Sequence, residues 1–497
     1  MATEFALLSP QQKGLPPDWR AGRLSDVAAL NPDQITTATH LERIAYVDIS
    51  CVSRGQISKP VDIPLSEAPS RARRLVRAGD TILSTVRPGN RAYAFIRSPP
   101  KNLVCSTGFV VLRARQGSAD PRFIYFLTSS ERVIQHLAVI AEKQTAYPSV
   151  TAKDVGECTV VIPPLPEQRA IARVLGTLDD EIVSRMGQSK GLRRVFDHLM
   201  RHLLDGSWSV HEGESWLREV RPLVQAYDDK IELNRRMNQT LEEICRALFK
   251  FWFVDFGPVR AKAEGRWKKG ESLPGMPADM WDFWPSEFEE SEIGEIPKGW
   301  KPVSLTEIAS LLTGGTPSTA EPAYWNGGIP WVSGKDVSAA KGGFIIQTER
   351  TITGEGVENS ATALLPARTV VITARGTVGA LGVIASDMCI SQTNYGLKAL
   401  DGIGDNFLLF TVGNAIDQLQ RASYGTIFDT ITTRNLQATI VVLPPEPLRS
   451  EFELRTHFLM ERVLLKLHEG KTLASTRDAL LPKLLSGEIR VPVDEGK

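Results

Sequence analysis

The sequence has few cysteines and no long hydrophobic run. Its five cysteines lie far apart and form no Cys-x-x-Cys pair, unlike the closely spaced cysteines of disulfide scaffolds and zinc sites. No run approaches the roughly 18 apolar residues that a membrane-spanning helix needs. The first residues also lack the basic and apolar regions of a signal peptide. These absences predict a cytoplasmic protein with reduced thiols, without disulfides, a zinc site or a membrane span.

Sequence motifs of common enzyme classes are also missing. There is no G-x-S-x-G, no H-E-x-x-H, no G-x-G-x-x-G after a strand and no NPPY-like tetrapeptide of aminomethyltransferases. Residues 468–472 end in Lys-Thr like a phosphate-binding loop, but Leu465 occupies the position of the first required glycine. His198 and His202 have metal-binding spacing on an expected helix, but no third ligand is near in sequence, which favours two polar-face histidines. The sequence predicts no catalytic residue, no metal site and no cofactor bound by this chain.

The formal net charge is zero, yet the charge is unevenly distributed. Residues 17–163 hold 19 Lys and Arg against 13 Asp and Glu, whereas residues 300–444 hold 9 against 11. A polyanion would therefore bind the first segment through its overall charge and the second only through a local basic patch.

Two segments of the chain resemble each other along their whole length. LPPDWRAGRLSDVAAL near residue 15 matches IPKGWKPVSLTEIASL near residue 296. ECTVVIPPLPEQR, ending at Arg169, matches ATIVVLPPEPLR, ending at Arg449. From Trp19 to Pro163 is 144 positions, and from Trp300 to Pro444 is also 144. A repeat of this size is a whole domain rather than a solenoid unit, and it predicts two similar ligands or one ligand with two similar halves.

Each repeat is predicted to be α+β. Short β-branched runs alternate with glycine-containing turns, and "strand, Arg, turn, strand" occurs once in each copy, which places Arg87 and Arg375 at equivalent turns. A helical stretch follows in both copies, and after it come matching loops that are rich in Thr, basic and aromatic residues. These loops align Thr145 with Thr426 and Tyr147 with Phe428.

The segments between and after the repeats are predicted to be helical. Apolar residues recur at helical spacing from Leu175 to Leu204, and again from Ile231 to Trp252 in a helix expected over 228–256. Residues 257–296 are rich in Pro, Gly and acidic residues and are typical of a linker along the surface. The acidic pairs Asp179-Asp180 and Asp228-Asp229 are expected at helix starts, where carboxylates stabilise the helix dipole.

Helix length suggests a spacing between the two repeats. A helix of about 27 residues spans roughly 40 Å, close to the ~34 Å repeat of major-groove faces in B-DNA. Two domains at opposite ends of an antiparallel helix pair could read two half-sites, although such a pair is also a common way to hold any two domains apart.

Three phrases of this sequence resemble the conserved regions of specificity subunits of type I restriction–modification systems. They are residues 163–182, PPLPEQRAIARVLGTLDDEI; residues 228–259, DDKIELNRRMNQTLEEICRALFKFWFVDFGPV; and residues 273–300, LPGMPADMWDFWPSEFEESEIGEIPKGW. The resemblance covers essentially the whole chain. It implies two similar α/β target-recognition domains, separated by long antiparallel, coiled-coil-like helices in a pseudo-twofold arrangement. The predicted order is target-recognition domain 15–163, helical spacer 164–210, second central helix 227–256 with a linker inside 211–296, target-recognition domain 297–444 and helical spacer 445–491.

The resemblance also implies a function. Such a chain is a non-catalytic DNA reader, and each recognition domain reads one half of a bipartite site. The helices set the spacing and dock two methyltransferase subunits, which carry S-adenosylmethionine and methylate adenine. A motor-nuclease subunit using ATP and Mg can join to cut unmethylated DNA. The alternative from another class is a protein–protein scaffold, or a tandem DNA-binding adaptor not tied to restriction.

The sequence departs from the family pattern in one respect. Family members usually have one central helical region, whereas this chain has two in series, because residues 164–210 end like a C-terminal region and 227–256 restate the central one. Residues 1–210 alone resemble a half-subunit joined to a longer partner.

Candidate DNA-contacting residues come from the turns and loops of each repeat. Arg87 and Arg375 could bind guanine bidentately, contact phosphate or be ordinary surface residues. Arg71, Arg73, Arg74 and Arg77 form a basic run that either follows the DNA backbone or is a solvated helix face. Tyr147 and Phe428 are equally explained as core anchors. The full set of candidates is Arg87, Lys143, Gln144, Tyr147, Lys153, Lys335, Arg375, Tyr424, Thr426, Thr433 and Arg434.

Overall fold

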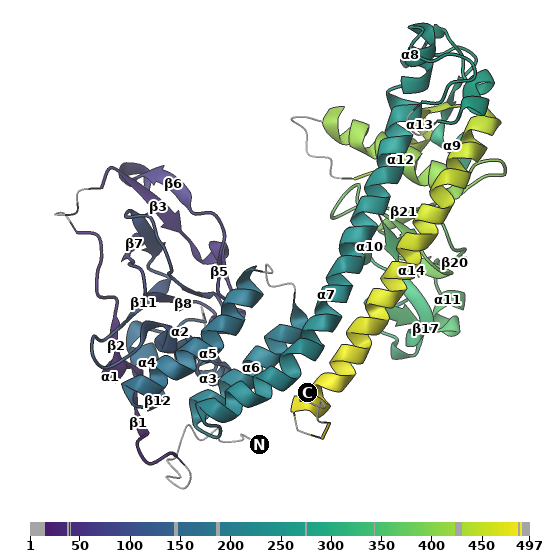
Figure 1. The fold of residues 1–497 in the computed structure, drawn as a ribbon. Helices are drawn as coiled ribbons and strands as arrows, with labels where there is room; N and C mark the ends of the chain where they lie inside the picture. Colours follow the sequence, from purple (N-terminus) through teal and green to yellow (C-terminus); the bar gives the residue numbers. More distant parts are fainter. Residues whose placement is uncertain are drawn as a thin grey trace, which may run out of the picture. The chain divides into compact units, whose positions relative to one another are not determined.

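The computed structural model divides the chain into two compact units (Figure 1). Unit 1 comprises Met1–Asp229 and Ala474–Lys497, and unit 2 comprises Lys230–Leu473. Each unit combines helices with several small sheets, so the predicted α+β class is confirmed. The structure describes residues 15–36, 39, 41–143, 148–184, 189–273, 276–341, 343–422, 430–485 and 488–489.

The first and last strands of each repeat pair with each other. In unit 1, β1 (Arg20–Arg23) runs antiparallel to β12 (Thr159–Ile162), and Arg20 lies opposite Ile162. In unit 2, β15 (Lys301–Ser304) runs antiparallel to β25 (Ile440–Leu443), and Lys301 lies opposite Leu443. The two pairs have the same length and register. In each repeat, the strand near its beginning therefore pairs with the strand near its end, so the repeat forms a closed structural unit.

The remaining strands of unit 1 form two four-stranded sheets and one small pair. Their orders are β6-β3-β10-β7, β2-β11-β8-β9 and β4-β5. The strands are β2 (Ala28–Leu30), β3 (Arg43–Val47), β4 (Val52–Ser53), β5 (Gln56–Ile57), β6 (Val61–Pro64), β7 (Ala72–Leu75), β8 (Thr81–Ser84), β9 (Tyr93–Phe95), β10 (Leu103–Ser106) and β11 (Phe109–Ala114).

Unit 2 repeats the two larger sheets, one of them with the additional edge strand β18, and has a separate strand pair that precedes the repeat. Its larger sheets have the orders β16-β24-β21-β22-β18 and β19-β17-β23-β20, and β13 pairs with β14. The strands are β13 (Phe288–Ser291), β14 (Gly294–Pro297), β16 (Ala309–Thr313), β17 (Trp325–Val332), β18 (Phe344–Ile345), β19 (Arg350–Ile352), β20 (Leu364–Leu365), β21 (Val370–Thr373), β22 (Leu381–Ile384), β23 (Met388–Ile390) and β24 (Asn394–Ala399).

Strand β8 of unit 1 and strand β21 of unit 2 lead into the two arginine turns. In unit 1, β8 pairs with β9 and β11, and in unit 2, β21 pairs with β22 and β24. Their residues are buried throughout, as is typical of a strand in the middle of a sheet. The turn that follows each strand therefore starts from a rigid position.

Apolar helices cover these sheets. In unit 1, α2 (Pro121–Ser129) and α3 (Glu131–Glu142) form the helical stretch that the sequence predicted, with a break at Ser130. In unit 2 the equivalent helix is α12 (Asp405–Ala422). Phe123 and Phe126 of α2, like Phe407 of α12, are almost completely buried in the main core of their unit.

The helical part of unit 1 brings together four helical segments. They are α5 (Leu165–Ser184), α6 (Lys190–Asp205), α7 (Val210–Phe249) up to Asp229, and α14 (Glu446–Leu485) from Ala474. Leu192, Val224 and Leu481 all lie in the main core of this unit. The end of the chain thus packs with helices more than 240 residues earlier in sequence.

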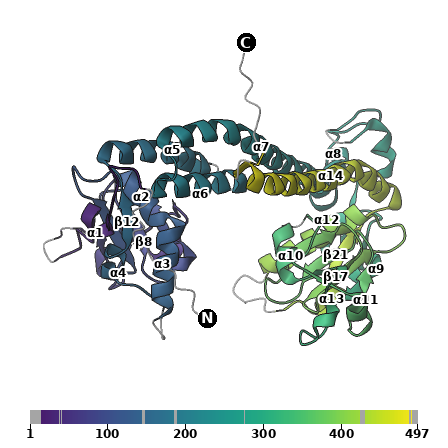
Figure 2. The same cartoon turned by 90° about the horizontal axis from the view of Figure 1, so that it is seen from below.

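In unit 2 the remaining parts of α7 and α14 run antiparallel. The Asn238 side-chain amide donates to the Val463 carbonyl over 3.2 Å, and Lys230 pairs with Glu469 over 3.5 Å. Residue numbers rise along one helix as they fall along the other. Figures 1 and 2 both show the two helices side by side in this unit. The predicted antiparallel pairing is therefore present within unit 2.

The central helix is longer than the sequence predicted. We expected a helix over 228–256, but α7 begins at Val210 and passes through Pro222, before one π turn, η4 (Lys250–Val254). Gly213 and Pro222 weakened the sequence signal, because both disfavour helix interiors. Val220 and Val224 are buried in the core of unit 1, and this packing compensates. The predicted second central helix is thus part of one continuous helix, α7, that contributes residues to both units, while residues 164–210 form the separate helices α5 and α6.

The segment predicted as a surface linker is packed into unit 2. It contains α8 (Gly257–Ala263) and the β13–β14 hairpin. Trp267 and Trp284 are 2% and 1% exposed and belong to the main core of the unit. The prediction of a linker along the surface was wrong, because it rested on the Pro, Gly and acidic content and did not weigh these tryptophans.

The two acidic pairs do not lie at helix starts. Asp179 and Asp180 lie near the end of α5, where both bind Arg97, at 3.1 and 2.6 Å. Burial raises the pKa of Asp179, while hydrogen bonds and ion pairs with Arg122 and Arg97 hold the pKa of Asp180 below its usual value. Asp228 lies in the middle of α7. Asp179 and Asp180 thus bind an arginine rather than a helix start, whereas Asp228, from the middle of its own helix, binds Arg477 and accepts from the Leu192 N–H in the first turn of α6.

Candidate nucleic-acid interface

The Arg87 turn of unit 1 is held against the loop that precedes the last helix of its repeat. Arg87 has a positive φ of 45°, which is uncommon for a residue with a side chain. Its N–H donates to the Pro148 carbonyl over 2.9 Å, and the Val150 N–H donates to the Thr85 carbonyl over 2.8 Å. The Arg87 side chain is exposed. The backbone of this turn is thus fixed by main-chain hydrogen bonds, and Arg87 is exposed on it.

The Arg375 turn of unit 2 is built in the same way. It follows β21, and the Ile431 N–H donates to the Ala374 carbonyl over 3.0 Å. The Ala374 N–H donates to Thr393, as that of Thr85 does to Gly108 in unit 1. Arg375 is exposed. The two turns are equivalent, as the sequence predicted, but their arginines are offset by one residue. With Thr85 matched to Ala374, Arg375 corresponds to Val86, and Arg87 corresponds to Gly376, which also has a positive φ, of 83°.

A threonine-capped helix follows each loop. Thr151 caps α4 (Ala152–Gly156) with Asp154, and Thr432 caps α13 (Thr433–Ala438) with Asn435. Hydrogen bonds from the Thr151 N–H and hydroxyl hold the pKa of Asp154 below its usual value. In each unit the structure thus brings the arginine turn and the threonine-containing loop, distant in sequence, to one place.

The predicted loop residues have mixed outcomes. Lys143 and Lys153 of unit 1 are exposed, as is Arg434 of unit 2, whereas Thr433 is half-buried. The others lie outside the described residues, as does Phe428: Gln144, Tyr147, Tyr424 and Thr426. A role in DNA contact stays a prediction for all of them.

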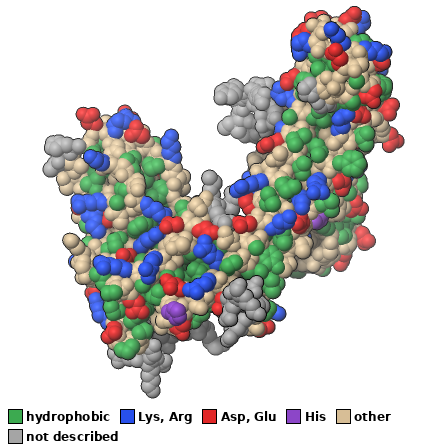
Figure 3. All heavy atoms as spheres, in the orientation of Figure 1, with side chains coloured by type: hydrophobic (Ala, Val, Ile, Leu, Met, Phe, Trp, Pro, Cys, Tyr) green, Lys and Arg blue, Asp and Glu red, His purple; other side chains and the backbone are tan. Residues whose placement is uncertain are grey.

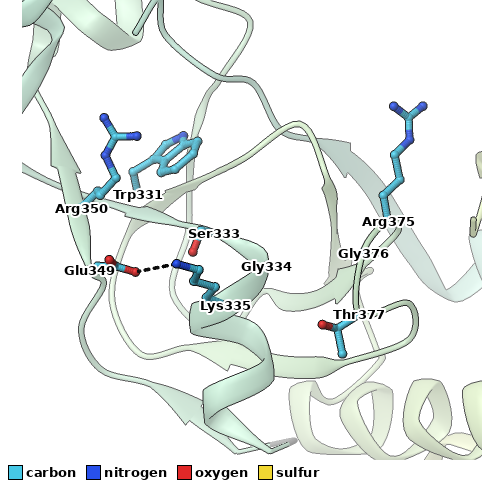
Figure 4. Close-up of a pocket in the computed structure, with 9 residues that line it drawn as sticks. All are labelled: Trp331, Ser333, Gly334, Lys335, Glu349, Arg350, Arg375, Gly376 and Thr377. Atoms are coloured by element: carbon cyan, nitrogen blue, oxygen red, sulfur yellow. Dashed lines mark ion pairs between the residues drawn. The ribbon is translucent and has the colours of Figure 1, made fainter. Parts of the chain in front are cut away.

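Lys335 and Arg375 line one cavity of about 390 Å³ in unit 2 (Figure 4). Lys335 lies in the first turn of α10 (Gly334–Ala340), directly after β17. Trp331 of β17, Arg350 at the start of β19 and Glu349 directly before that strand also line the cavity. Three of these side chains, Lys335, Arg350 and Arg375, are cations, so the cavity is the candidate for the local basic patch that the sequence predicted for binding of a polyanion by the second repeat.

The basic run of unit 1 lies on a strand and not on a helix. Ala72–Leu75 form β7, so the helix-face alternative is wrong. Arg71 pairs with Asp48 over 2.6 Å, and Arg77 pairs with Asp33 over 2.9 Å. Burial lowers the pKa of Arg74. Arg71 and Arg77 of this basic run thus form ion pairs with carboxylates of the same domain.

Sequence reasoning missed Glu349, Arg350 and Trp331. They come from two strands, and no periodic signal links them to Arg375. The one available signal was the motif PWVSGKDV, which drew attention to Lys335 but not to the strand that faces it.

The two histidines lie in an aromatic cluster. The His202 ring stacks on Trp208 at 4.6 Å, and His198 lies 5.1 Å from the ring of Trp216. Burial, with the nearby His202 charge, lowers the pKa of His198 to about 4. Among the described residues, no group of three His, Cys, Asp or Glu side chains could hold a metal ion, and no described helix is long and apolar enough to cross a membrane.

Both repeats match one protein family. The model of the type I restriction modification DNA specificity domain matches residues 16–189 and again residues 297–447. The chain therefore belongs to the type I restriction–modification DNA specificity family, in agreement with the resemblance found in its sequence.

Similar proteins include several specificity subunits. The type I restriction enzyme HindI specificity subunit of Haemophilus influenzae is 24% identical over 95% of this chain and 100% of its own length. The MjaIX specificity subunit of Methanocaldococcus jannaschii is 29% identical over 32% of this chain and 38% of its own. Among solved structures, the HsdS subunit from Thermoanaerobacter tengcongensis is 22% identical, over 96% of this chain and 98% of that one, with a TM-score of 0.34.

Proposed function

We propose that this chain is the non-catalytic DNA sequence-specificity subunit of a type I restriction–modification complex. Each repeat reads one half of a bipartite site. The observation that carries the proposal is the doubled specificity domain, in which both copies hold an exposed arginine turn against the loop before a threonine-capped helix. No observation favours the protein–protein scaffold.

The partners follow from this assignment. Two methyltransferase subunits dock on the helices and supply S-adenosylmethionine, and motor-nuclease subunits supply ATP- and Mg-dependent cleavage. The chain itself contributes base recognition, and its exposed Arg and Lys side chains contact phosphates.

Selection from a random duplex DNA library tests the proposal. The full chain is expected to enrich a two-part motif with a fixed spacer. Affinity is expected to fall roughly 100-fold or more between about 50 and 200 mM salt, because Lys and Arg contacts release counterions. Absence of any enriched motif would contradict the proposal.

An exposed apolar stripe on α14 supports docking of a protein partner. Leu454, Phe458 and Leu465 are 58%, 70% and 64% exposed. At about 100° per residue these positions lie within roughly 40° of each other on the helix. Figure 3 shows hydrophobic side chains, in green, along the long helices of unit 2. We assign this stripe to a methyltransferase subunit.

Phe458→Asp is expected to weaken co-purification of the methyltransferase subunit by about 10-fold or more, because large aromatic side chains dominate interface energy. Lys471→Glu, exposed elsewhere on the same helix, is the control and is expected to leave it unchanged. Pull-down at matched concentrations measures both. Equal retention of the partner by the Phe458→Asp and wild-type chains would remove this stripe from the interface.

A further inference from the structure

The cavity of unit 2 has an unusual charge composition for a surface that meets DNA. It presents three cations, Lys335, Arg350 and Arg375, together with one carboxylate, Glu349. Three cations suit a polyanion, but a carboxylate repels phosphate. Phosphate binding alone therefore does not explain Glu349.

Nor does fold stability explain the pairing of Glu349 with Lys335. The Lys335 ammonium lies 3.9 Å from the Glu349 carboxylate, and the two side chains are 85% and 66% exposed. Exposed ion pairs of this kind contribute little to stability. Figure 4 shows the two side chains pointing toward each other across the cavity. Both are free to exchange this weak contact for contacts to a ligand.

The pairing of β17 with β19 and the carboxylate of Asp336 hold together the two segments that carry this pair. One of its carboxylate oxygens accepts from the Ser333 N–H and hydroxyl at 2.8 and 2.6 Å. The other accepts from the Glu349 N–H at 3.0 Å. The half-buried Asp336 carboxylate thus connects Ser333, in the turn before Lys335, to the backbone of Glu349.

Arg350 is also pre-positioned. Its guanidinium carbon lies 3.5 Å from the centroid of the Trp325 ring, the distance of a stacked cation–π contact. In Figure 4 the Arg350 and Arg375 side chains point in a similar direction, away from the Glu349–Lys335 pair. The two arginines therefore leave the Glu349–Lys335 pair available for a ligand of its own.

Unit 1 has a mixed-charge pair at the equivalent strand end. β3 pairs in parallel with β10 as β17 does with β23, which makes Tyr46 the counterpart of Trp331. Arg71 binds Asp48, two residues after Tyr46, and also the Tyr46 hydroxyl, at 2.6 and 3.2 Å. A carboxylate and a cation thus recur at this place in both repeats, supplied by different residue positions.

We propose that Glu349 and Lys335 together read one base pair of the half-site bound by the second repeat. This inference rests on the proposed function and adds the chemistry of recognition. In every Watson–Crick pair, a major-groove amino group donates to a keto oxygen about 2.9 Å away. A carboxylate and an ammonium 3.9 Å apart match such a pair: Glu349 accepts from the amino group of A or C, and Lys335 donates to the keto oxygen of the partner T or G. Glu349 and Lys335 thus distinguish a base pair with A or C on a given strand from one with G or T on that strand.

Exchange of the two charges is the test. The full-length K335E/E349K chain keeps its net charge and is selected against the same random duplex library as the wild type. One position in one half of the motif is expected to change from A or C to G or T, with preference altered roughly 5- to 100-fold. The responding position should lie in the half that Arg375→Ala also affects, and the other half should stay unchanged.

Glu349→Gln separates base reading from charge. Removing a carboxylate is expected to strengthen binding to unrelated DNA, since repulsion of phosphate is lost, while preference at the same position relaxes. Glu358→Gln, an exposed carboxylate of the same unit, is the control and should leave the motif intact. Circular dichroism establishes that all variants fold.

Three outcomes decide the matter. A changed base at one position supports the inference. An unchanged motif in the exchange variant, with a wild-type motif present, overturns the inference and leaves the proposed function standing. A wild-type chain that selects no motif overturns both.

Discussion

Replacement of Asp228 by alanine is expected to destabilise unit 1 by about 3–5 kcal/mol, because it leaves a buried guanidinium without its main partner. Asp228 binds the Arg477 guanidinium and the Ser189 hydroxyl, and it accepts from the Leu192 N–H over 3.2 Å. The Asp228 and Arg477 side chains are only 4% and 5% exposed. One carboxylate therefore joins α6, α7 and the end of α14.

Hydrogen exchange of peptides from α5 and α6, together with urea unfolding, measures this effect. Lys230→Ala, which breaks an exposed ion pair between the same two long helices, is the matched control and is expected to cost under about 1 kcal/mol. Asp228→Leu combined with Arg477→Met should recover most of the loss, since apolar pairs can replace buried ion pairs. An Asp228→Ala effect no larger than that of Lys230→Ala would show that this network does not hold the helices together.

Arg87→Ala and Arg375→Ala are each expected to relax base preference in one half of the recognised site only. Each residue is exposed on a turn whose backbone is held by main-chain hydrogen bonds, so alanine is expected to remove the guanidinium and keep the turn. Loss of a bidentate contact to a base costs about 1–3 kcal/mol of discrimination. Competition binding with DNA altered in one half-site at a time measures this.

Lysine at the same positions separates the two kinds of contact. Lysine keeps the charge but lacks the planar fork of arginine. If the arginines read bases, Arg87→Lys and Arg375→Lys restore affinity for unrelated DNA without restoring base preference. Degradation of both halves by either alanine variant would contradict the assignment of one repeat to each half.

The repeated frame was predictable from sequence because its signals are local. The Trp19 and Trp300 phrases, the proline-terminated last strands and the arginine turns each lie within a short stretch. Their counterparts pair in the same register in the structure. The resemblance in the helical phrases identified the family, which the doubled domain match confirms.

The missed features depend on contacts between distant segments. Helix α7 passes through Pro222 because valines on the same stretch are buried in unit 1, and local propensity cannot report that burial. Trp267 and Trp284 are core residues within a segment whose composition is that of a linker. Glu349 faces Lys335 because β17 pairs with β19 and because Asp336 binds both Ser333 and the Glu349 N–H. In each case tertiary packing decided the outcome.

Sequencing of the methylated bases in cells that carry this gene with its neighbours, against a strain lacking it, tests the central claim most directly. The account predicts a split adenine-methylation motif of two different half-sites with a fixed spacer, lost on deletion and altered in one half by Arg375→Ala. Identical methylation in the two strains, or an alteration of both halves by Arg375→Ala, would contradict it.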